Sequence, residues 1–187
     1  SYILDGKPMS SGKVTTLSEY SIVSENRLTA VPQDTPPELC AILGCALTTA
    51  MGIIDNEVDL KFGESVAVIG CGGVGLNLIQ ASAMKSACPI IAVDNNPTKE
   101  RMCLDIGASK FYTSIDQIEE LKDSFDVVFE TSGFAGNFKA GLIALKPTGT
   151  AVIYGVFQEE MLFDFNQVSE FKELTLIGGH LADDASF

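Results

Sequence analysis

The chain has 187 residues, of which 46% are hydrophobic and 20% charged, and its formal net charge at pH 7 is −13. The length fits one ordinary domain with some residues to spare, and the composition excludes a disordered chain. The negative charge argues against nucleic acid and anionic membranes as partners, because nothing would neutralise their phosphates. We find no apolar run of spanning length and no basic segment followed by an apolar one, so we expect neither a transmembrane segment nor a signal peptide.

The cysteines indicate a reducing compartment. There are five, an odd number without the spacing of a disulfide framework, at Cys40, Cys45, Cys71, Cys88 and Cys103. Several lie in apolar runs, as buried reduced thiols do, whereas disulfides persist mainly in oxidising compartments. We therefore expect a cytoplasmic protein.

The first 35 residues have β-strand character without the content of a whole domain. The residue pattern predicts short strands over Ser18–Val23 and Arg27–Val31. Two such strands cannot support themselves, so they lie against the following domain or belong to a β-rich domain whose other part is absent. Prolines then mark a connection, and the run ELCAILGCALTTAMGII predicts an apolar helix over Glu38–Ile54. Gly44 and Cys45 predict a break or a close approach midway along that helix.

The most specific pattern of the chain follows a short apolar run, Ser65–Ile69, that predicts a buried strand. Gly70, Gly72 and Gly75 then have the G-x-G-x-x-G spacing. The first glycine allows a tight turn, the second lets the backbone approach a pyrophosphate, and the third lets the next helix pack close to the sheet. Amide groups at the N-terminus of that helix would bind the phosphates.

The residues after the glycines complete a dinucleotide-binding pattern. A helical pattern leads into a second buried strand, Ile90–Val93, which Asp94 closes. A carboxylate there can accept hydrogen bonds from the ribose diol of adenosine, and it would repel a 2′-phosphate. A lone glycine pattern is a weak signal, but strand, helix, second strand and acid in this order predict an NAD site.

The remaining residues alternate between predicted helices and strands. Helices are expected over Pro97–Ile106, Ile115–Lys122, Phe138–Leu145 and Asn166–Phe171, and strands over Lys110–Thr113, Phe125–Thr131, Gly149–Tyr154 and Leu174–Ile177. This order predicts an α/β fold with a doubly wound parallel sheet, the Rossmann fold, preceded by a short β-rich segment. Ligands of such sheets bind outside the carboxyl ends of the strands, and we expect Gly70, Gly133 and Gly155 to line one crevice there.

Several runs together resemble the zinc-containing medium-chain alcohol dehydrogenase family. They are YILDG, SEYSIVSENRLTAVP, GCALTTAMG, ESVAVIGCGGVGLNLIQ, IIAVDNNPTKE and LDIGASKF, and they cover almost the whole chain. The resemblance implies that residues 1–35 are a remnant of a β-rich catalytic domain and residues 36–187 an NAD-binding Rossmann domain. Family members are longer and pair through the edge of this sheet, so the chain is expected to be a fragment of a homo-oligomeric enzyme.

The resemblance also implies site residues. Cys45 matches the family's last catalytic zinc ligand and Thr49 a position beside the nicotinamide, although Thr49 could equally be a helix threonine bonded to the preceding turn. Because catalytic zinc keeps three protein ligands, one thiolate cannot hold it, and we expect no zinc in this chain itself. The coenzyme-binding positions of the family, beside the three glycines of the loop, are matched by Gly73, Val74, Asp94, Lys99, Thr131, Ser132, Gly155 and Val156.

The implied activity is hydride transfer between NAD and a small alcohol or carbonyl compound. In the full-length parent, zinc bound partly through Cys45 would act as a Lewis acid on the substrate oxygen, and the chain alone is expected to be inactive. Two alternatives stay open: a zinc-free, quinone-reductase-like NAD(P)H reductase of the same superfamily, and a non-catalytic NAD-sensing module. Cys45 disfavours the first, because a zinc-free relative does not need a thiol there.

Overall fold

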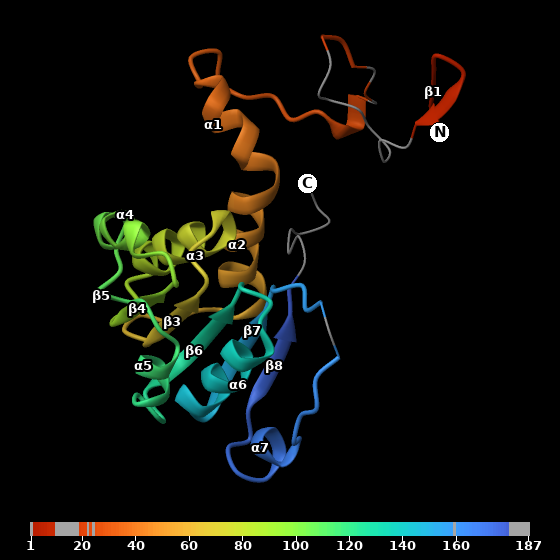
Figure 1. Ribbon diagram of the computed structural model, residues 1–187. Helices are drawn as coiled ribbons and strands as arrows, with labels where there is room; N and C mark the ends of the chain where they lie inside the picture. The colour runs from red at the N-terminus through yellow and green to blue at the C-terminus, as the bar shows by residue number, and fades with distance from the viewer. Residues whose placement is uncertain (1, 10–18, 22, 24, 159, 180–187) are drawn as a thin grey trace. The chain divides into compact units, whose positions relative to one another are not determined.

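The computed structural model describes residues 2–9, 19–21, 23, 25–158 and 160–179. The chain divides into two compact units, Ser1–Cys40 and Ala41–Phe187. The second unit holds a six-stranded sheet in the order β5-β4-β3-β6-β7-β8, in which every neighbouring pair is parallel (Figure 1). The strands are β3 Val66–Ile69, β4 Ile90–Val93, β5 Lys110–Tyr112, β6 Phe125–Glu130, β7 Leu145–Ile153 and β8 Thr175–Gly178. The predicted doubly wound α/β fold is confirmed.

Helices cover both faces of this sheet (Figure 1). They are α2 Thr48–Gly52, α3 Gly73–Met84, α4 Glu100–Asp105, α5 Asp116–Glu119, α6 Ala135–Ala144 and α7 Asn166–Ser169. Since successive strand residues point to opposite faces, Val66 and Val68 pack in one core cluster with residues of α3 and α4. Ala67 and Ile69 pack in the other cluster, with residues of α5 and α6. All four side chains of β3 are buried, which explains why its sequence reads as one continuous apolar run.

The helical segment before the sheet is irregular where the sequence predicts a break. It consists of α1 Pro37–Ile42, a π-helical stretch Leu43–Leu47, α2, and a second π-helical stretch Ile53–Glu57. Gly44 and Cys45 lie in the first π-helical stretch. The hydroxyl of Thr48 donates to the carbonyl of Leu43 at 2.5 Å, so a side chain also satisfies the backbone at this point.

The whole helical stretch Pro37–Glu57 has 21 residues and a mean hydropathy of 1.7 in its most apolar window, and is therefore long and apolar enough to cross a membrane. The expectation that no apolar run reaches spanning length is therefore wrong for this segment. The sequence pattern predicts a helix only as far as Ile54, whereas the observed helix continues to Glu57. Length and composition alone are weak arguments, since a core helix of a soluble protein passes the same test. In this stretch 22% of the most apolar window is buried, and Ala50, Ile53 and Ile54 pack in the core beside α3.

The first unit contains an antiparallel hairpin of β1 Tyr2–Leu4 and β2 Lys7–Met9, and a 3-10 turn, Glu25–Arg27. The strand predicted over Arg27–Val31 is wrong. The N–H of Leu28 closes the turn by donating to the carbonyl of Glu25 at 3.1 Å. Leu28 and Val31 are 65% and 45% exposed, so the alternating pattern buries no face and a strand gains nothing there.

The strand predicted over Ser18–Val23 falls partly outside the described residues. Residues 19–21 and 23 are described, and none of them is in a strand. An alternating pattern of this length does not distinguish a strand from an extended loop, because a strand also requires a neighbouring strand in register.

Strand β7 begins four residues before the predicted start at Gly149. Leu145 pairs with Phe125, and the register then shifts before Thr150 pairs with Val127. Pro147 falls within this irregular part, where a missing N–H does not interrupt a regular ladder. A proline usually favours a turn, which is why the sequence predicts a later start for the strand. The register shift explains why β7 accommodates it.

Candidate functional site

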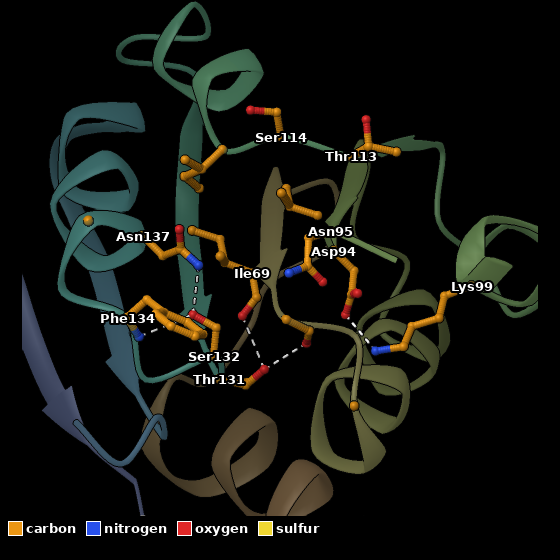
Figure 2. A pocket seen from close by; sticks show the side chains of 15 residues that line it. Ile69, Asp94, Asn95, Lys99, Thr113, Ser114, Thr131, Ser132, Phe134 and Asn137 are labelled. Atoms are coloured by element: carbon orange, nitrogen blue, oxygen red, sulfur yellow. Dashed lines mark hydrogen bonds and ion pairs between the residues drawn. The ribbon is translucent and has the colours of Figure 1, made fainter. Parts of the chain in front are cut away.

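A cavity of about 630 Å³ lies outside the carboxyl ends of β3, β4, β5 and β6 (Figure 2). It is lined by Ile69, Gly70, Gly72, Val93, Asp94, Asn95, Lys99, Thr113, Ser114, Ile115, Thr131, Ser132, Phe134, Gly136 and Asn137. Ligand sites of α/β sheets occur at this end of the strands, and this volume is within the usual range for a small-molecule site. The predicted location of the crevice is confirmed.

The glycine loop connects β3 to α3 in a turn that requires glycine at positions 70 and 75. Gly70 has φ +97°, and its N–H donates to the carbonyl of Val93 at 2.8 Å. A Cβ on Gly75 would lie 1.9 Å from the carbonyl oxygen of Gly70. The helix therefore starts almost in contact with the end of the strand, and the amide groups of its first turn, which have no acceptor within the helix, are directed toward the cavity end of the sheet.

Asp94 is the polar centre of the cavity wall. One carboxylate oxygen accepts the N–H of Cys71 at 2.8 Å and the Nζ of Lys99 at 2.7 Å, and the other accepts the N–H of Asn96 at 2.9 Å. Burial by itself would raise the pKa of Asp94, but the Lys99 ammonium and the two backbone N–H groups outweigh burial and hold the pKa below its ordinary value. Asp94 thus offers an oriented anionic acceptor beside the glycine loop.

Lys99 reaches Asp94 from the turn after β4, and the two side chains form an ion pair in Figure 2. The Asp94 side chain is 8% exposed and that of Lys99 is 32% exposed. The ammonium group therefore lies at the cavity rim, with donor capacity left for a bound hydroxyl group.

The buried thiol of Cys71 has a structural position in the loop. Its Sγ donates to the carbonyl of Val93 at 3.6 Å. Burial raises the pKa of the Cys71 thiol, with smaller contributions from the neighbouring Cys103 and Asp94. The thiol is consequently protonated and unreactive at neutral pH.

The end of β6 forms the opposite wall of the cavity. The Thr131 hydroxyl lies 2.6 Å from the carbonyl oxygen of Gly70 and 3.1 Å from that of Ile69, which ties this strand end to the glycine loop. The amide of Asn137, on α6, donates to the Ser132 hydroxyl oxygen at 2.8 Å (Figure 2). Thr131 and Ser132 both line the cavity, as their positions after the strand predict.

The other strand-end glycines do not line the cavity. A Cβ on Gly133 would lie 2.7 Å from the carbonyl oxygen of Val156, and one on Gly155 would lie 2.3 Å from the N of Gly133. Gly133 and Gly155 therefore pack the end of β6 against the end of β7. The prediction that three glycines line one crevice is correct for Gly70 and wrong for the other two.

Cys45 and Thr49 also lie outside the lining of the cavity. Cys45 is exposed, and Thr49 is buried with its carbonyl accepting from the Tyr154 hydroxyl at 3.3 Å. The threonine that bonds to the preceding turn is the neighbouring Thr48. Among the residues that the structure describes, no three His, Cys, Asp or Glu side chains come together in a way that could hold a metal ion. The described donors alone therefore do not fit a zinc site.

Of the other predicted coenzyme residues, Gly72 lines the cavity, whereas Gly73, Val74 and Gly75 contribute the start of α3 behind it. Val156 is outside the lining and 79% exposed. Sequence reasoning missed nine lining residues: Ile69, Val93, Asn95, Thr113, Ser114, Ile115, Phe134, Gly136 and Asn137. Asn95, Thr113 and Ser114 lie within two residues after the end of β4 or β5, and the rule that ligands bind at carboxyl strand ends could have found those three.

A parallel sheet with this glycine loop, a helix that starts on it and an acid at the neighbouring strand end defines a Rossmann-type dinucleotide-binding domain. Residues 73–187 match the family model described as zinc-binding dehydrogenase. The chain belongs to this family.

Individual relatives agree with the family assignment. The chain is 32% identical over 154 residues to S-(hydroxymethyl)glutathione dehydrogenase of Saccharomyces cerevisiae, covering 76% of this chain and 40% of that protein. Its fold matches benzyl alcohol dehydrogenase of Acinetobacter calcoaceticus with a TM-score of 0.78 and 25% identity, over 88% of this chain and 48% of that one. A zinc-binding dehydrogenase of Sinorhizobium meliloti 1021, solved with NADP bound, matches with a TM-score of 0.67 and 26% identity. This match covers 74% of this chain and 43% of that one. The chain thus spans less than half the length of these relatives.

Proposed function

We propose that the chain is the coenzyme-binding part of an NAD-dependent alcohol dehydrogenase of the zinc type, which transfers hydride between NAD and a small alcohol or carbonyl compound. The observation that carries the proposal is the Asp94 carboxylate, held beside the glycine loop by Cys71 and Lys99. Its position at the end of β4, one strand from the loop, suits the ribose diol of a dinucleotide whose pyrophosphate lies at the start of α3.

Each predicted residue has a role in this proposal. Gly70, Gly72 and Gly75, with the backbone of Gly73 and Val74, shape and bind the pyrophosphate site. Asp94 and Lys99 bind the adenosine ribose. Thr131 and Ser132 form the wall at the end of β6, and Gly155, Val156 and Thr49 lie toward the nicotinamide.

Asp94 favours NAD over NADP as the coenzyme. A 2′-phosphate would bring negative charge to a carboxylate that is nearly buried and already ionised. The relative from Sinorhizobium meliloti was solved with NADP, so the family match by itself does not select the coenzyme. Lys99 is the one cation in the cavity lining of the described part, and its charge is matched by Asp94.

Cys45 is proposed as one ligand of a zinc ion whose other ligands lie outside this chain. It is exposed, as a thiolate that meets a metal shared with another segment must be. The family match with zinc-binding dehydrogenases favours this interpretation over a zinc-free reductase or a non-catalytic NAD sensor. Zinc would supply Lewis-acid chemistry, while the residues described above position the coenzyme.

Domain division, assembly and location are proposed from the same pattern. Residues 1–35 would belong to a catalytic domain and residues 36–187 to the coenzyme domain. Strand β8 is the last in the sheet order, and pairing of two copies along this edge would give a homo-oligomer. All five cysteines are free, in line with a reducing cytoplasm.

Titration of the chain with NADH, followed by the fluorescence of the nicotinamide, tests the proposal. We expect saturable binding at one site, and competition by ADP-ribose, because the described cavity accommodates the adenosine half of the coenzyme. Lys139→Ala is a matched control, since Lys139 is an exposed residue of α6 outside the cavity lining. Absence of saturable binding would contradict the proposal.

The proposal that Cys45 binds zinc must be tested on a longer protein that contains the other zinc ligands. In the product of a gene that supplies the missing catalytic domain, Cys45→Ala should lower the zinc content and the rate of alcohol oxidation. It should leave NADH affinity within about twofold of the wild type, since the thiol is outside the cavity. Unchanged zinc content would contradict the assignment of Cys45.

A further inference from the structure

The last residue of β6, Glu130, is a carboxylate that is only 2% exposed. One of its oxygens accepts the N–H of Ser132 at 2.9 Å, the N–H of Gly133 at 3.0 Å and the hydroxyl of Ser132. A Cβ on Gly155 would lie 2.2 Å from the other oxygen, so the absence of a side chain at that position makes room for the carboxylate. Glu130 does not line the cavity, but it holds the turn that does.

These contacts fix the direction of a chain of hydrogen bonds. An oxygen that already accepts two backbone N–H groups is also the acceptor toward the Ser132 hydroxyl, which therefore donates its single hydrogen to Glu130. The Ser132 oxygen can then only accept hydrogen bonds from its other neighbours. It accepts the N–H of Phe134 at 3.4 Å and the side-chain amide of Asn137, which must present its NH₂ group, as the 2.8 Å contact from Nδ2 shows.

These hydrogen bonds fix the side-chain carbonyl oxygen of Asn137 as a hydrogen-bond acceptor at the cavity wall. With Nδ2 directed at Ser132, the carbonyl oxygen of Asn137 points away from Ser132 (Figure 2). Asn137 lines the cavity together with Ile115 and Phe134, whose apolar surfaces suit the faces of a flat ring. If Asp94 binds the ribose and the start of α3 binds the pyrophosphate, the base must lie in this remaining part of the cavity.

We propose, resting on the proposed function, that Glu130 and Ser132 are positioning residues that orient the Asn137 amide as an acceptor for the exocyclic amino group of adenine. The cavity thereby selects adenine over hypoxanthine, which carries an oxygen at that position. An oxo group facing the Asn137 oxygen would leave two acceptors opposed without a hydrogen between them.

The test compares the dissociation constants of NAD and nicotinamide hypoxanthine dinucleotide on the full 187-residue chain by calorimetry. We expect the wild type to bind NAD about tenfold more tightly, the effect of one hydrogen bond together with an unpaired acceptor. Ser132→Ala and Asn137→Ala should reduce this ratio to about twofold or less. A general structural defect would weaken both ligands alike and leave the ratio unchanged.

A third variant tests Glu130, and a fourth serves as the control. Glu130→Leu removes the acceptor of the Ser132 hydroxyl, so it should lower the ratio to about twofold or less, as Ser132→Ala does. Asn166→Ala, on α7 and outside the cavity, should retain both affinities. Equal binding of the two dinucleotides by the wild type, or an unchanged ratio in Ser132→Ala, overturns this inference and leaves the proposed function intact. Failure of both dinucleotides to bind overturns the two together.

Discussion

Replacement of Gly75 by alanine tests the packing of the glycine loop most sharply. The new Cβ would lie 1.9 Å from the carbonyl oxygen of Gly70, whereas ordinary contacts begin at 3.4 Å, so the strand end and α3 must separate by about 1.5 Å. The obstacle is backbone and cannot rotate away. Since overpacking of a core costs about 1–3 kcal/mol and this clash is severe, we expect Gly75→Ala to lower the free energy of unfolding by about 3 kcal/mol. The midpoint of thermal unfolding should fall by roughly 6–12 °C.

Gly72→Ala is the matched control on the same loop. Nothing lies within 4 Å of a Cβ built on Gly72, and its φ of −83° is accessible to alanine. The free energy of unfolding, measured by urea denaturation, should therefore stay within about 1 kcal/mol of the wild type. NADH affinity should nevertheless fall at least about tenfold, because the methyl group occupies the space of the pyrophosphate. Equal stability of Gly75→Ala and Gly72→Ala would refute the described packing.

Three further predictions concern stability and reactivity. Lys172→Met should lower the free energy of unfolding in urea by about 2 kcal/mol, because the Lys172 Nζ donates to three carbonyls at the end of α6. The pKa of Asp126 is held below its ordinary 3.8, since hydrogen bonds from a lysine and a serine outweigh the opposing effect of burial. Ionised Asp126 therefore stabilises the fold above that pH, and the stability deficit of Asp126→Asn in urea should shrink as the pH falls from 7 to below 3.8. In a colorimetric thiol assay the exposed Cys88 should react in the folded protein, while Cys71 and Cys103 react only after unfolding; fast labelling of Cys71 would contradict its burial.

The sheet and the glycine loop are predictable because their causes are local. Strands buried on both faces read as continuous apolar runs, and Ile90–Val93 is found to the residue. The glycine spacing reflects contacts within a single turn, as the closeness of Gly75 to Gly70 illustrates. The apolar strand run and the glycine spacing together predict the role of Asp94, since it is the first residue after the second strand.

Other parts of the site depend on how distant segments meet. Asn137 lines the cavity with its amide bonded to Ser132 at the end of β6, and no local sequence pattern on α6 predicts that contact. Gly133 and Gly155 occupy strand ends as expected, yet they face each other and not the cavity. The alternation over Arg27–Val31 predicts a strand that the backbone does not form, because alternation alone supplies no neighbouring strand.

The coenzyme preference of Asp94 is the central claim. Titration of the wild-type chain with NAD and NADP should give a dissociation constant for NAD that is at least about tenfold lower, the effect of one lost hydrogen-bonded pair together with charge repulsion. In Asp94→Ala that ratio should fall to about twofold or less. Equal affinity of the wild type for the two coenzymes, or a ratio that survives in Asp94→Ala, would contradict the account.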